Sequence, residues 1–539
     1  MKISQTPFTT LPFSSLFTDY LSKQNAVHDF FEYLPFEETE LLRRAQEISF
    51  HNNRTEVFEE LKSFNLHYGA GSETLASLEK LKAPGALSVV TGQQVILFGG
   101  PLFTIYKILT TILWAEKMER LYSRPVIPVF WMADEDHDFE EAASIGLYEG
   151  QTLKRIQMQK EGDHSKRVSD TELGASYAEF RKDVQSLLHD TDFSDEVMTL
   201  LDESYNQSSS IGEGFGKLIL SLFGKYGLVL AGSNGKKLKQ MMKVPLKRSV
   251  EKQAQIYSDL RQTSQDLADA GYHNQVQIQP STLFYIDENK NRLRIQLENG
   301  EWSVAESEMR WTSTELIARI EKEPERFSPN VILRPLVQNY ILPAAVYVAG
   351  PGEVAYYAQM KRIYSHFDLK MPLILPRFSI TLRENAIQKQ MEGLPFDLHS
   401  YSKRIEDLES DYLSKADTPD VEILFSGWKE GIETTSRPFS KSVSNIDPTL
   451  EAASAKVVTL FQNELDKLKG KVYRSLKESE KVHIKRIHRI QAQLFPNRSL
   501  QEREIASVWY MNKYGTSLWD QIFSLLKDEI PDSHKLIDL

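Results

Sequence analysis

The stretch at residues 86–141 constrains the fold more than any other part of the 539-residue chain. A short β-branched run at 86–91 is bounded by glycine on both sides, which is typical of a buried strand. Pro101 suits the first position of a helix, and apolar residues at helical spacing continue it to about Glu119. A second apolar run at 126–131 predicts another strand. Two strands joined by such a helix are most simply parallel, so we predict the βαβ unit of an open α/β sheet.

The net charge and the missing residue types exclude several classes of protein. A formal net charge of −11 leaves no dominant basic face, so we expect no nucleic-acid partner. A small anionic substrate in a local pocket is compatible with this charge. The chain has no cysteine, which excludes disulfides, thiolate zinc sites and a cysteine nucleophile, and which suits the cytosol.

The N-terminal residues do not have the pattern of a secretory signal, because they carry one lysine and no long apolar run. Apolar stretches elsewhere are interrupted before about 18 residues, the length that a membrane-spanning helix requires. We therefore expect a cytoplasmic protein without a membrane partner.

The length predicts two or three domains. We expect a parallel α/β-sheet core at 1–380, a coiled-coil helical domain at 381–500 and a C-terminal helical segment at 501–539. The expected additions to the core are a helical preamble at 1–84, a polar insertion at about 150–210 and a β-rich insertion at about 272–300. The β-rich insertion begins with a predicted strand at 276–279, where apolar and polar residues alternate.

Two long helical patterns predict an antiparallel hairpin in the coiled-coil domain. In the first arm, apolar residues from Ile387 to Tyr412 are spaced alternately by four and three, although Gly393 and Pro395 interrupt the pattern. The second arm runs from about Thr449 to Phe495. Such a hairpin leaves one apolar face uncovered, so we expect a second copy of the chain to cover it in a homodimer.

The first candidate site is the turn between the predicted strand and helix. Glycine lets the backbone approach a ligand closely, and the N–H groups at a helix start favour phosphate or carboxylate. The turn matches neither G-x-G-x-x-G nor the P-loop, and a tight turn that needs glycine only for steric reasons is the alternative. The candidate binding residues here are Thr91, Gly92, Gln93, Gln94, Gly99, Gly100, Thr104 and Lys107.

The second candidate is the acidic loop that follows the second strand, with Asp134, Glu135, Asp136 and His137. Ligands of open α/β sheets bind at the carboxyl ends of the strands, so this loop and the glycine turn are expected to line one crevice. The loop could supply a general base, an ammonium site or a metal site, and His137 is the natural proton carrier. The alternative is a solvated acidic turn before a helix N-terminus. One histidine without spaced partners is a weak zinc signal, so we expect no metal.

A third candidate combines a glycine turn, Gly350 to Gly352, with Glu353 at a predicted strand-to-helix junction. A simple turn with a helix-stabilising glutamate explains the same residues equally well. Three arginines are candidate anion clamps, with surface ion pairing as the alternative: Arg334, Arg377 and Arg383.

Several motifs together resemble the BshC family of bacillithiol biosynthesis proteins, the cysteine-adding enzymes. They are VVTGQQ at 89–94, FGGPLFTIYK at 98–107, PVFWMADEDHDFEE at 128–141, GYHNQVQ at 271–277, AGPGEVAYYAQ at 349–359 and LFPNRSLQERE at 494–504. The resemblance covers essentially the whole chain. It implies a Rossmann-like core similar to nucleotidyltransferases, a coiled coil that supports a dimer, and a ligase that joins cysteine to the amine of glucosaminyl malate. It places site residues at Thr91, Gly92, Gln93, Gln94, Gly99, Gly100, Lys107, Glu135, Asp136 and His137.

The chain lacks the HIGH and KMSKS signatures that stabilise adenylation in related nucleotidyltransferases, so ATP is an expectation from fold analogy alone. Under the ligase hypothesis, Glu135, Asp136 or His137 orients the cysteine ammonium or accepts the attacking amine's proton. Backbone near Gly99 and Gly100 is expected to hold phosphate or malate. The competing hypothesis is a coiled-coil scaffold or sensor whose Rossmann-like domain binds a nucleotide or metabolite without turnover.

Overall fold

A computed structural model describes residues 1–135, 138–160, 167–205, 210–233, 235–415 and 421–539. The chain divides into two compact units. Residues 3–381 and 501–537 form the first, here the Rossmann-like unit, and residues 1–2, 382–500 and 538–539 form the second, here the helical unit. The segment after the helical unit was expected to be a separate helical tail. It belongs to the Rossmann-like unit and ends in a strand, β15 (His534–Asp538).

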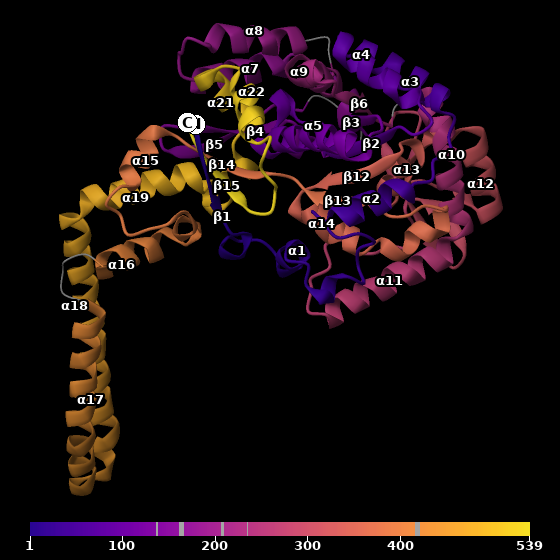
Figure 1. Ribbon diagram of the computed structural model, residues 1–539. Helices are drawn as coiled ribbons and strands as arrows, with labels where there is room; N and C mark the ends of the chain where they lie inside the picture. Colours follow the sequence, from indigo (N-terminus) through magenta and orange to yellow (C-terminus); the bar gives the residue numbers. More distant parts are fainter. Residues whose placement is uncertain (136–137, 161–166, 206–209, 234, 416–420) are drawn as a thin grey trace. The chain divides into compact units, whose positions relative to one another are not determined.

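A five-stranded parallel sheet forms the centre of the Rossmann-like unit (Figure 1), which confirms the predicted α/β fold. Its strands, in spatial order, are β13 (Leu373–Pro376), β12 (Ala344–Ala349), β2 (Leu87–Gln94), β3 (Val126–Ala133) and β6 (Val229–Ala231). The predicted pair β2 and β3 is parallel and in register from Leu87 opposite Val126 to Gln94 opposite Ala133. Helix α5 (Leu102–Tyr122) makes the crossover between them.

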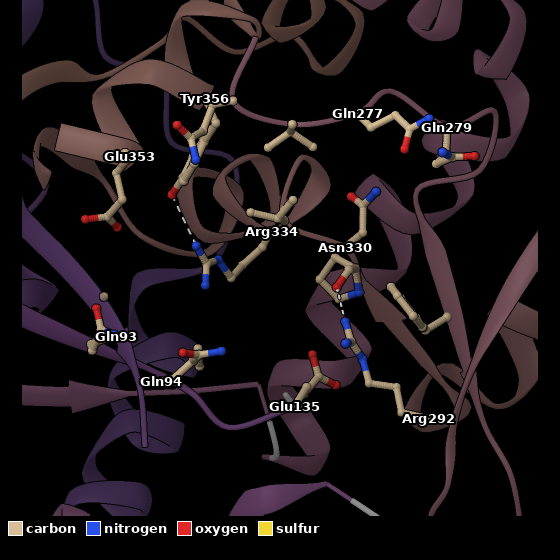
Figure 2. A pocket seen from close by; sticks show the side chains of 18 of the residues that line it. Gln93, Gln94, Glu135, Gln277, Gln279, Arg292, Asn330, Arg334, Glu353 and Tyr356 are labelled. Atoms are coloured by element: carbon tan, nitrogen blue, oxygen red, sulfur yellow. Dashed lines mark hydrogen bonds between the residues drawn. The ribbon is translucent and has the colours of Figure 1, made fainter. Parts of the chain in front are cut away.

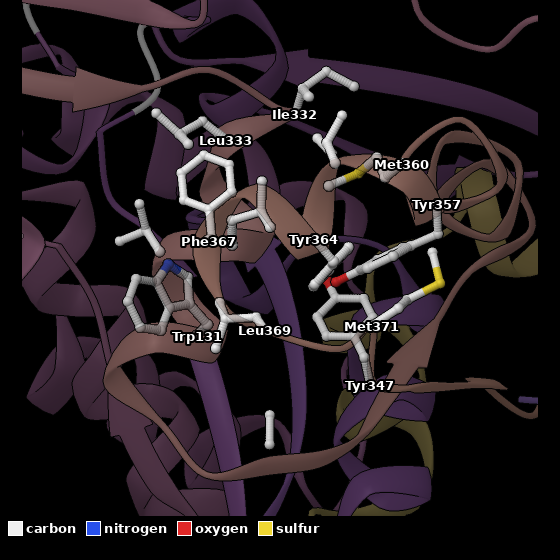
Figure 3. Packing of buried hydrophobic residues seen from close by; sticks show 14 of the residues in the cluster. Trp131, Ile332, Leu333, Tyr347, Tyr357, Met360, Tyr364, Phe367, Leu369 and Met371 are labelled. Atoms are coloured by element: carbon white, nitrogen blue, oxygen red, sulfur yellow. The ribbon is translucent and has the colours of Figure 1, made fainter. Parts of the chain in front are cut away.

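Both faces of this sheet are buried, which is why its strands are almost continuously apolar. Leu87 and Val89 point to one face, where they pack with Trp114 and Met118 of α5. Val90 points to the other face and joins a larger cluster that includes Trp131 and aromatic residues after β12. Figure 3 shows part of that cluster, and the rings of Tyr347 and Tyr357 lie 4.9 Å apart between centroids.

Helices of the Rossmann-like unit surround the sheet. The helices before β2 are α1 (Ser15–Leu21), α2 (Glu38–Gln46), α3 (Arg54–His67) and α4 (Ser72–Glu79). Those that follow are α6 (Phe139–Ala142), α7 (Ser176–Leu187), α8 (Ser194–Ser204), α9 (Ile211–Phe223), α10 (Lys236–Glu251), α11 (Gln253–Asp269), α12 (Ser313–Lys322), α13 (Leu333–Ile341) and α14 (Pro351–Ala358). The C-terminal ones are α20 (Gln501–Glu504), α21 (Ser507–Tyr514) and α22 (Leu518–Leu525).

The β-rich insertion is larger than expected and begins later. Five strands pair antiparallel in the order β10, β9, β8, β7, β11, and they extend the insertion to residue 329. Their bounds are β7 (Leu283–Ile286), β8 (Arg292–Glu298), β9 (Glu301–Val304), β10 (Arg310–Trp311) and β11 (Phe327–Pro329). The smaller sheets contain β4 (Ser144–Glu149) with β5 (Thr152–Gln157), and β1 (Lys2–Thr6) with β15 and β14 (Ser379–Arg383).

The strand predicted at 276–279 was wrong. The N–H of Val276 donates to Oε1 of Gln359, and Nε2 of Gln359 donates to the carbonyl of Val276. A side-chain amide thus satisfies the backbone groups that a neighbouring strand would otherwise pair.

The helical unit contains a long hairpin, but its first arm is not the predicted one. Helix α17 (Val421–Ile446) packs against α18 (Glu451–Ser479), joined by a short turn (Figure 1). The expected first arm is broken into α15 (Asn385–Met391) and α16 (Ile405–Lys415), and both contact α19 (Lys481–Leu494). The arm is interrupted near Gly393 and Pro395, because both residue types disfavour a continuous helix. Helix α17 was missed because Gly427, Gly431 and Pro438 weaken its helical pattern.

Candidate active site

The carboxyl ends of all five parallel strands deliver residues to one cavity of about 960 Å³ in the Rossmann-like unit. Gln93 and Gln94 end β2, and Glu135 follows β3. Gly350 follows β12, and Arg377 follows β13. Ser233 follows β6, and Figure 2 shows Gln93, Gln94, Glu135 and Glu353 around the cavity. This is the place where ligands of open α/β sheets bind.

The structure brings most, but not all, of the predicted site residues to this cavity. The predicted residues that line it are Gly92, Gln93, Gln94, Lys107, Glu135, Arg334, Gly350, Gly352, Glu353 and Arg377. Five others are buried and are not among its described lining residues: Thr91, Gly99, Gly100, Thr104 and Asp134. Arg383 lies in the helical unit, where it pairs with Asp538 at 2.7 Å. Asp136 and His137 lie outside the described residues.

The glycine turn is covered by the chain's own backbone. Gly99 and Gly100 have φ of +81° and +68°, a region that favours glycine. The N–H of Leu102, at the start of α5, donates to the carbonyl of Ile505 at 2.9 Å. The N–H of Ser507 donates to the carbonyl of Gly100 at 3.0 Å. The glycines therefore have a structural reason in this fold, and the first N–H of α5 already has an acceptor.

A buried ion pair links the first and third predicted sites. Nζ of Lys107 lies 2.5 Å from Oε2 of Glu353 and also donates to the carbonyl of Gly92 at 2.8 Å and to Oε1 of Gln93 at 2.9 Å. Glu353 accepts further bonds, at 2.7 Å each, from the N–H of Gly350 and the hydroxyl of Tyr347. Burial lowers the pKa of Lys107 and opposes ionisation of Glu353, but Lys107 and these donors hold the pKa of Glu353 below its usual value. The network fixes the ends of β2 and β12 next to each other.

The acidic loop is anchored by a lysine that the sequence analysis did not identify. Nζ of Lys239, on α10, pairs with Oε1 of Glu135 and donates to the carbonyl of Phe327 at 2.8 Å, and the lysine and the glutamate are both buried. Lys239 carried no signal in the sequence because it is one of several lysines on a polar helix. Glu135 thus presents a charge-compensated carboxylate at the cavity.

Asp134, the first residue of the acidic loop, is buried in a site that opposes its charge. Both of its carboxylate oxygens accept from the N–H of Ser233, at 3.0 and 3.1 Å, and only 1% of the residue is exposed. Burial, with the nearby charge of Glu135, raises the pKa of Asp134 to about 7.

We expect Asp134→Asn to stabilise the Rossmann-like unit at pH 8. Because the pKa of Asp134 rises from 3.8 to about 7 on folding, ionisation costs stability as the pH increases between these values. The cost is complete above pH 7 and amounts to at most about 4 kcal/mol, whereas asparagine stays neutral and can still accept from Ser233. Urea unfolding of both proteins at pH 5 and pH 8 measures this difference. An advantage of the variant that is equal at both values would contradict the expected titration.

Cationic residues gather at this cavity although the chain as a whole is acidic. Arg334, on α13, donates to the hydroxyl of Tyr356 at 3.2 Å (Figure 2). Among the described residues, no carboxylate lies within ion-pairing distance of Arg334. Arg292, on β8, donates to Oγ of Ser328 at 2.9 Å and its guanidinium lies 3.8 Å from the ring centre of Phe284. Arg334 is therefore the cation best placed to meet an anionic ligand.

Two groups of lining residues were missed by the sequence analysis. Three glutamines at alternate positions, Gln275, Gln277 and Gln279, line the cavity from the extended segment before β7. The alternation of apolar and polar residues was visible in the sequence but was interpreted as a strand of the β-rich insertion. Arg503, after the helical unit, also lines the cavity. It was missed because it is far from β2 in the sequence.

The described parts of the chain contain neither a metal-binding cluster nor a membrane-spanning helix. In those parts, no cluster of three or more histidine, aspartate or glutamate side chains is arranged to hold a metal ion. Nor is any helix there both long and apolar enough to cross a bilayer.

A parallel sheet with a polar cavity at the carboxyl ends of its strands defines a ligand-binding protein of the Rossmann-like α/β class. Comparison with known proteins identifies the family. Residues 1–378 match the profile of the bacillithiol biosynthesis BshC N-terminal Rossmann-like domain, and residues 380–539 match that of the BshC C-terminal coiled-coil domain. The chain therefore belongs to the BshC family.

Curated relatives match this chain over almost its full length. A protein of Chlorobium phaeobacteroides is 30% identical, with 98% of this chain and 97% of the relative covered. A protein of Salinibacter ruber is 32% identical over 97% and 96% of the two chains, and one of a Geobacillus species is 31% identical over 95% of each. Each is named as a proposed cysteine ligase, BshC.

Proposed function

We propose that this chain is a bacillithiol-pathway ligase that forms an amide between the carboxyl group of cysteine and the amine of glucosaminyl malate. The family and the names of its relatives support a cysteine ligase. The observation that carries the finer proposal is that one cavity holds a carboxylate, Glu135, and a cation without an ion-pair partner among the described residues, Arg334. The two substrates carry amino groups and carboxylates, and such a pair requires both kinds of side chain.

Glu135 is the described residue best suited to hold the ammonium group of cysteine. Its Oε1 contacts Lys239, and the side-chain amide of Gln94 lies at the same end of the cavity (Figure 2). The amine of the second substrate attacks the activated carboxyl carbon, the bond from that carbon to the activating group breaks, and the amine loses a proton. We assign the proton acceptor to the acidic loop, among Glu135, Asp136 and His137.

Arg334 would hold a carboxylate of the malyl group, because a guanidinium binds a carboxylate through charge-assisted hydrogen bonds. The sugar hydroxyls would lie along Gln275, Gln277 and Gln279, since amides both donate to and accept from hydroxyl groups. This places the charged and uncharged parts of one substrate on two walls of the cavity.

Amide formation in water needs an activated carboxyl group, and ATP is the activator that the fold class suggests. The cationic lining, with Arg334, Arg377 and Arg503, fits a phosphate-bearing ligand, and about 960 Å³ is large enough for one. When bound, ATP would convert the carboxyl oxygen of cysteine into a leaving group. The N–H of Leu102 at the start of α5 already donates to the carbonyl of Ile505, so this N–H is not available to the phosphates of ATP.

Turnover tests the proposal. The purified chain is incubated with cysteine, glucosaminyl malate and ATP, and the thiol product is followed by mass spectrometry together with pyrophosphate or ADP. Formation of the amide confirms the ligase. Tight metabolite binding without product under any nucleotide condition would favour a sensor that does not turn over its ligand.

We also propose that the helical unit forms a homodimer. Large apolar side chains are exposed on both arms of the hairpin, among them Trp428 and Phe439 on α17, and Val457, Leu460 and Phe461 on α18. Exposed large apolar side chains of this kind, here called the apolar stripe, are typical of an interface. A second copy covers the same stripe by symmetry.

We expect the double substitution Leu460→Lys and Phe461→Lys to give a monomer in light scattering. These side chains are 55% and 58% exposed in one chain, so lysine at these positions should lower the stability of a single hairpin only slightly. In a dimer, the same lysines would place charge in the interface. Ala455→Lys with Thr459→Lys is the matched control, because it adds the same two charges at exposed positions that lie about 100° or more around the helix from both Leu460 and Phe461. If the double variant keeps the mass of a dimer, the apolar stripe is not the interface.

A further inference from the structure

A fully buried ion pair lies at the wall of the cavity and joins two distant parts of the Rossmann-like unit. Arg377 follows β13, and Glu502 lies on α20, in the segment after the helical unit. The two terminal nitrogens of Arg377 donate to the two oxygens of Glu502 at 2.8 and 2.9 Å. This bidentate geometry orients the guanidinium plane as well as neutralising its charge.

Glu502 is itself fixed by its surroundings. Its oxygens also accept from the hydroxyl of Ser379 and the N–H of Ile380, at 2.9 Å each, and none of its side chain is exposed. Arg377 and the N–H of Ile380 hold the pKa of Glu502 below its usual value against the effect of burial. The carboxylate is therefore a rigid, charged support.

The third nitrogen of Arg377 is different. Its Nε is buried and has no hydrogen-bond acceptor among the described residues. An unsatisfied buried donor is costly, so it calls for an explanation such as a ligand oxygen. The donor is close to the backbone of Gly350: a methyl group added there would lie 3.7 Å from Nε of Arg377 and 3.9 Å from Cε of Lys107.

Gly350 is not required by its backbone conformation. Its φ is −77° and its ψ is 168°, an extended conformation that any residue adopts. The nearest atom to an added methyl group is Oε2 of Glu353 at 3.4 Å, an ordinary contact distance. Glycine at this position therefore leaves open a space of about one methyl group beside Nε of Arg377.

We infer that Nε of Arg377 and the space beside Gly350 form an oxyanion subsite, and that Glu502 is the positioning residue that holds Arg377 there. The ligand is a carboxylate or phosphate oxygen. The inference rests on the proposed ligase only for the identity of the group that supplies the oxyanion. Under that proposal, the group is a malyl carboxylate or a nucleotide phosphate. It makes the segment after the helical unit part of the active site.

Other contacts from this segment support that role. Arg503 lines the same cavity. Ala506 donates to the carbonyl of Gly146 at 2.9 Å, and a side chain at Gly146 would collide with the carbonyl of Glu504, 2.0 Å away. The segment is thus docked on the rest of the Rossmann-like unit directly after Glu502.

Isothermal titration calorimetry with the full chain tests the subsite without requiring turnover. The probes are glucosaminyl malate and ATP, and inorganic phosphate and malate serve as the minimal oxyanions. We expect Gly350→Ala to weaken at least one probe about tenfold or more, while the melting temperature stays close to that of the unmodified chain. The probe that is weakened identifies the source of the oxyanion.

A double-mutant cycle tests the role of Glu502. Arg377→Met and Glu502→Gln are each expected to weaken that same probe about tenfold, and the double variant is expected to bind no worse than Arg377→Met alone, because Glu502 acts only through Arg377. The double variant removes both charges, and glutamine can still accept from Ile380, so it controls for folding. Additive losses would overturn the positioning role.

Unchanged affinity for every probe in Gly350→Ala and in the folded double variant would overturn the subsite. So would the absence of measurable binding of any probe to the unmodified chain. Binding that follows the expected pattern without amide formation would instead contradict the proposed ligase and leave the subsite standing.

Discussion

Replacing Arg334 by methionine is expected to raise the KM for glucosaminyl malate about 100-fold, with a smaller effect on the KM for cysteine. Arg334 lines the cavity, and no described carboxylate pairs with it. A hydrogen bond to a charged group contributes roughly 1.5–3 kcal/mol, and about 2.7 kcal/mol corresponds to a factor of 100 in affinity. Steady-state kinetics with each substrate varied in turn measures the effect.

Two controls separate binding from folding. Arg334→Lys keeps the charge but not the planar fork, so we expect it to recover part of the affinity. Arg310→Met removes an exposed arginine of the β-rich insertion and should leave both KM values unchanged. An Arg334→Met protein with the kinetics of the unmodified chain would show that the malyl group binds elsewhere.

Replacing Lys107 by methionine is expected to destabilise the Rossmann-like unit by about 3–5 kcal/mol, the usual cost of leaving one partner of a buried ion pair uncompensated. Glu353 would keep its bonds from Gly350 and Tyr347 but lose the cation 2.5 Å away. Urea unfolding followed by tryptophan fluorescence measures the loss. Trp428 is the single tryptophan of the seven that belongs to the helical unit, so a Trp428→Phe background confines the signal to the Rossmann-like unit.

The double variant Lys107→Met with Glu353→Gln should recover most of that stability. It removes both charges, and glutamine can still accept from the N–H of Gly350 and donate to Tyr347. Recovery without catalytic activity would show that the pair acts in the site as well as in the fold. If Lys107→Met alone unfolds at the same urea concentration as the unmodified protein, the pair does not stabilise the unit.

The sequence predicted the elements whose signals are local. Strands β2 and β3 and helix α5 were expected at nearly their observed bounds, because an apolar run between glycines and a proline at a helix start are patterns of neighbouring residues. The parallel pairing followed from the crossover helix alone.

Predictions failed where distant residues decide the local structure. Residues 276–279 alternate like a strand, yet the side chain of Gln359 takes both backbone hydrogen bonds of Val276. Helix α17 forms in spite of two glycines and a proline, because packing against α18 outweighs weak propensity.

The same division applies to the candidate site. Gln93, Gln94, Lys107, Glu135 and Glu353 were identified from strand ends and helix starts, and all of them line the cavity. Lys239, Glu502 and Arg503 were not, since their roles depend on partners about 100 residues or more away in the sequence.

By itself, the sequence determined the class of fold, the family, and the strand ends that line the candidate site, because periodicity, glycine placement and charge are properties of neighbouring residues. Only the tertiary structure decided which charges are already neutralised and which remain available. Lys107, Glu135 and Arg377 have buried partners, whereas Arg334 pairs with no described carboxylate. The physical reason is that the energy of a charge depends on its burial and on its nearest partners, and residues distant in the sequence supply both.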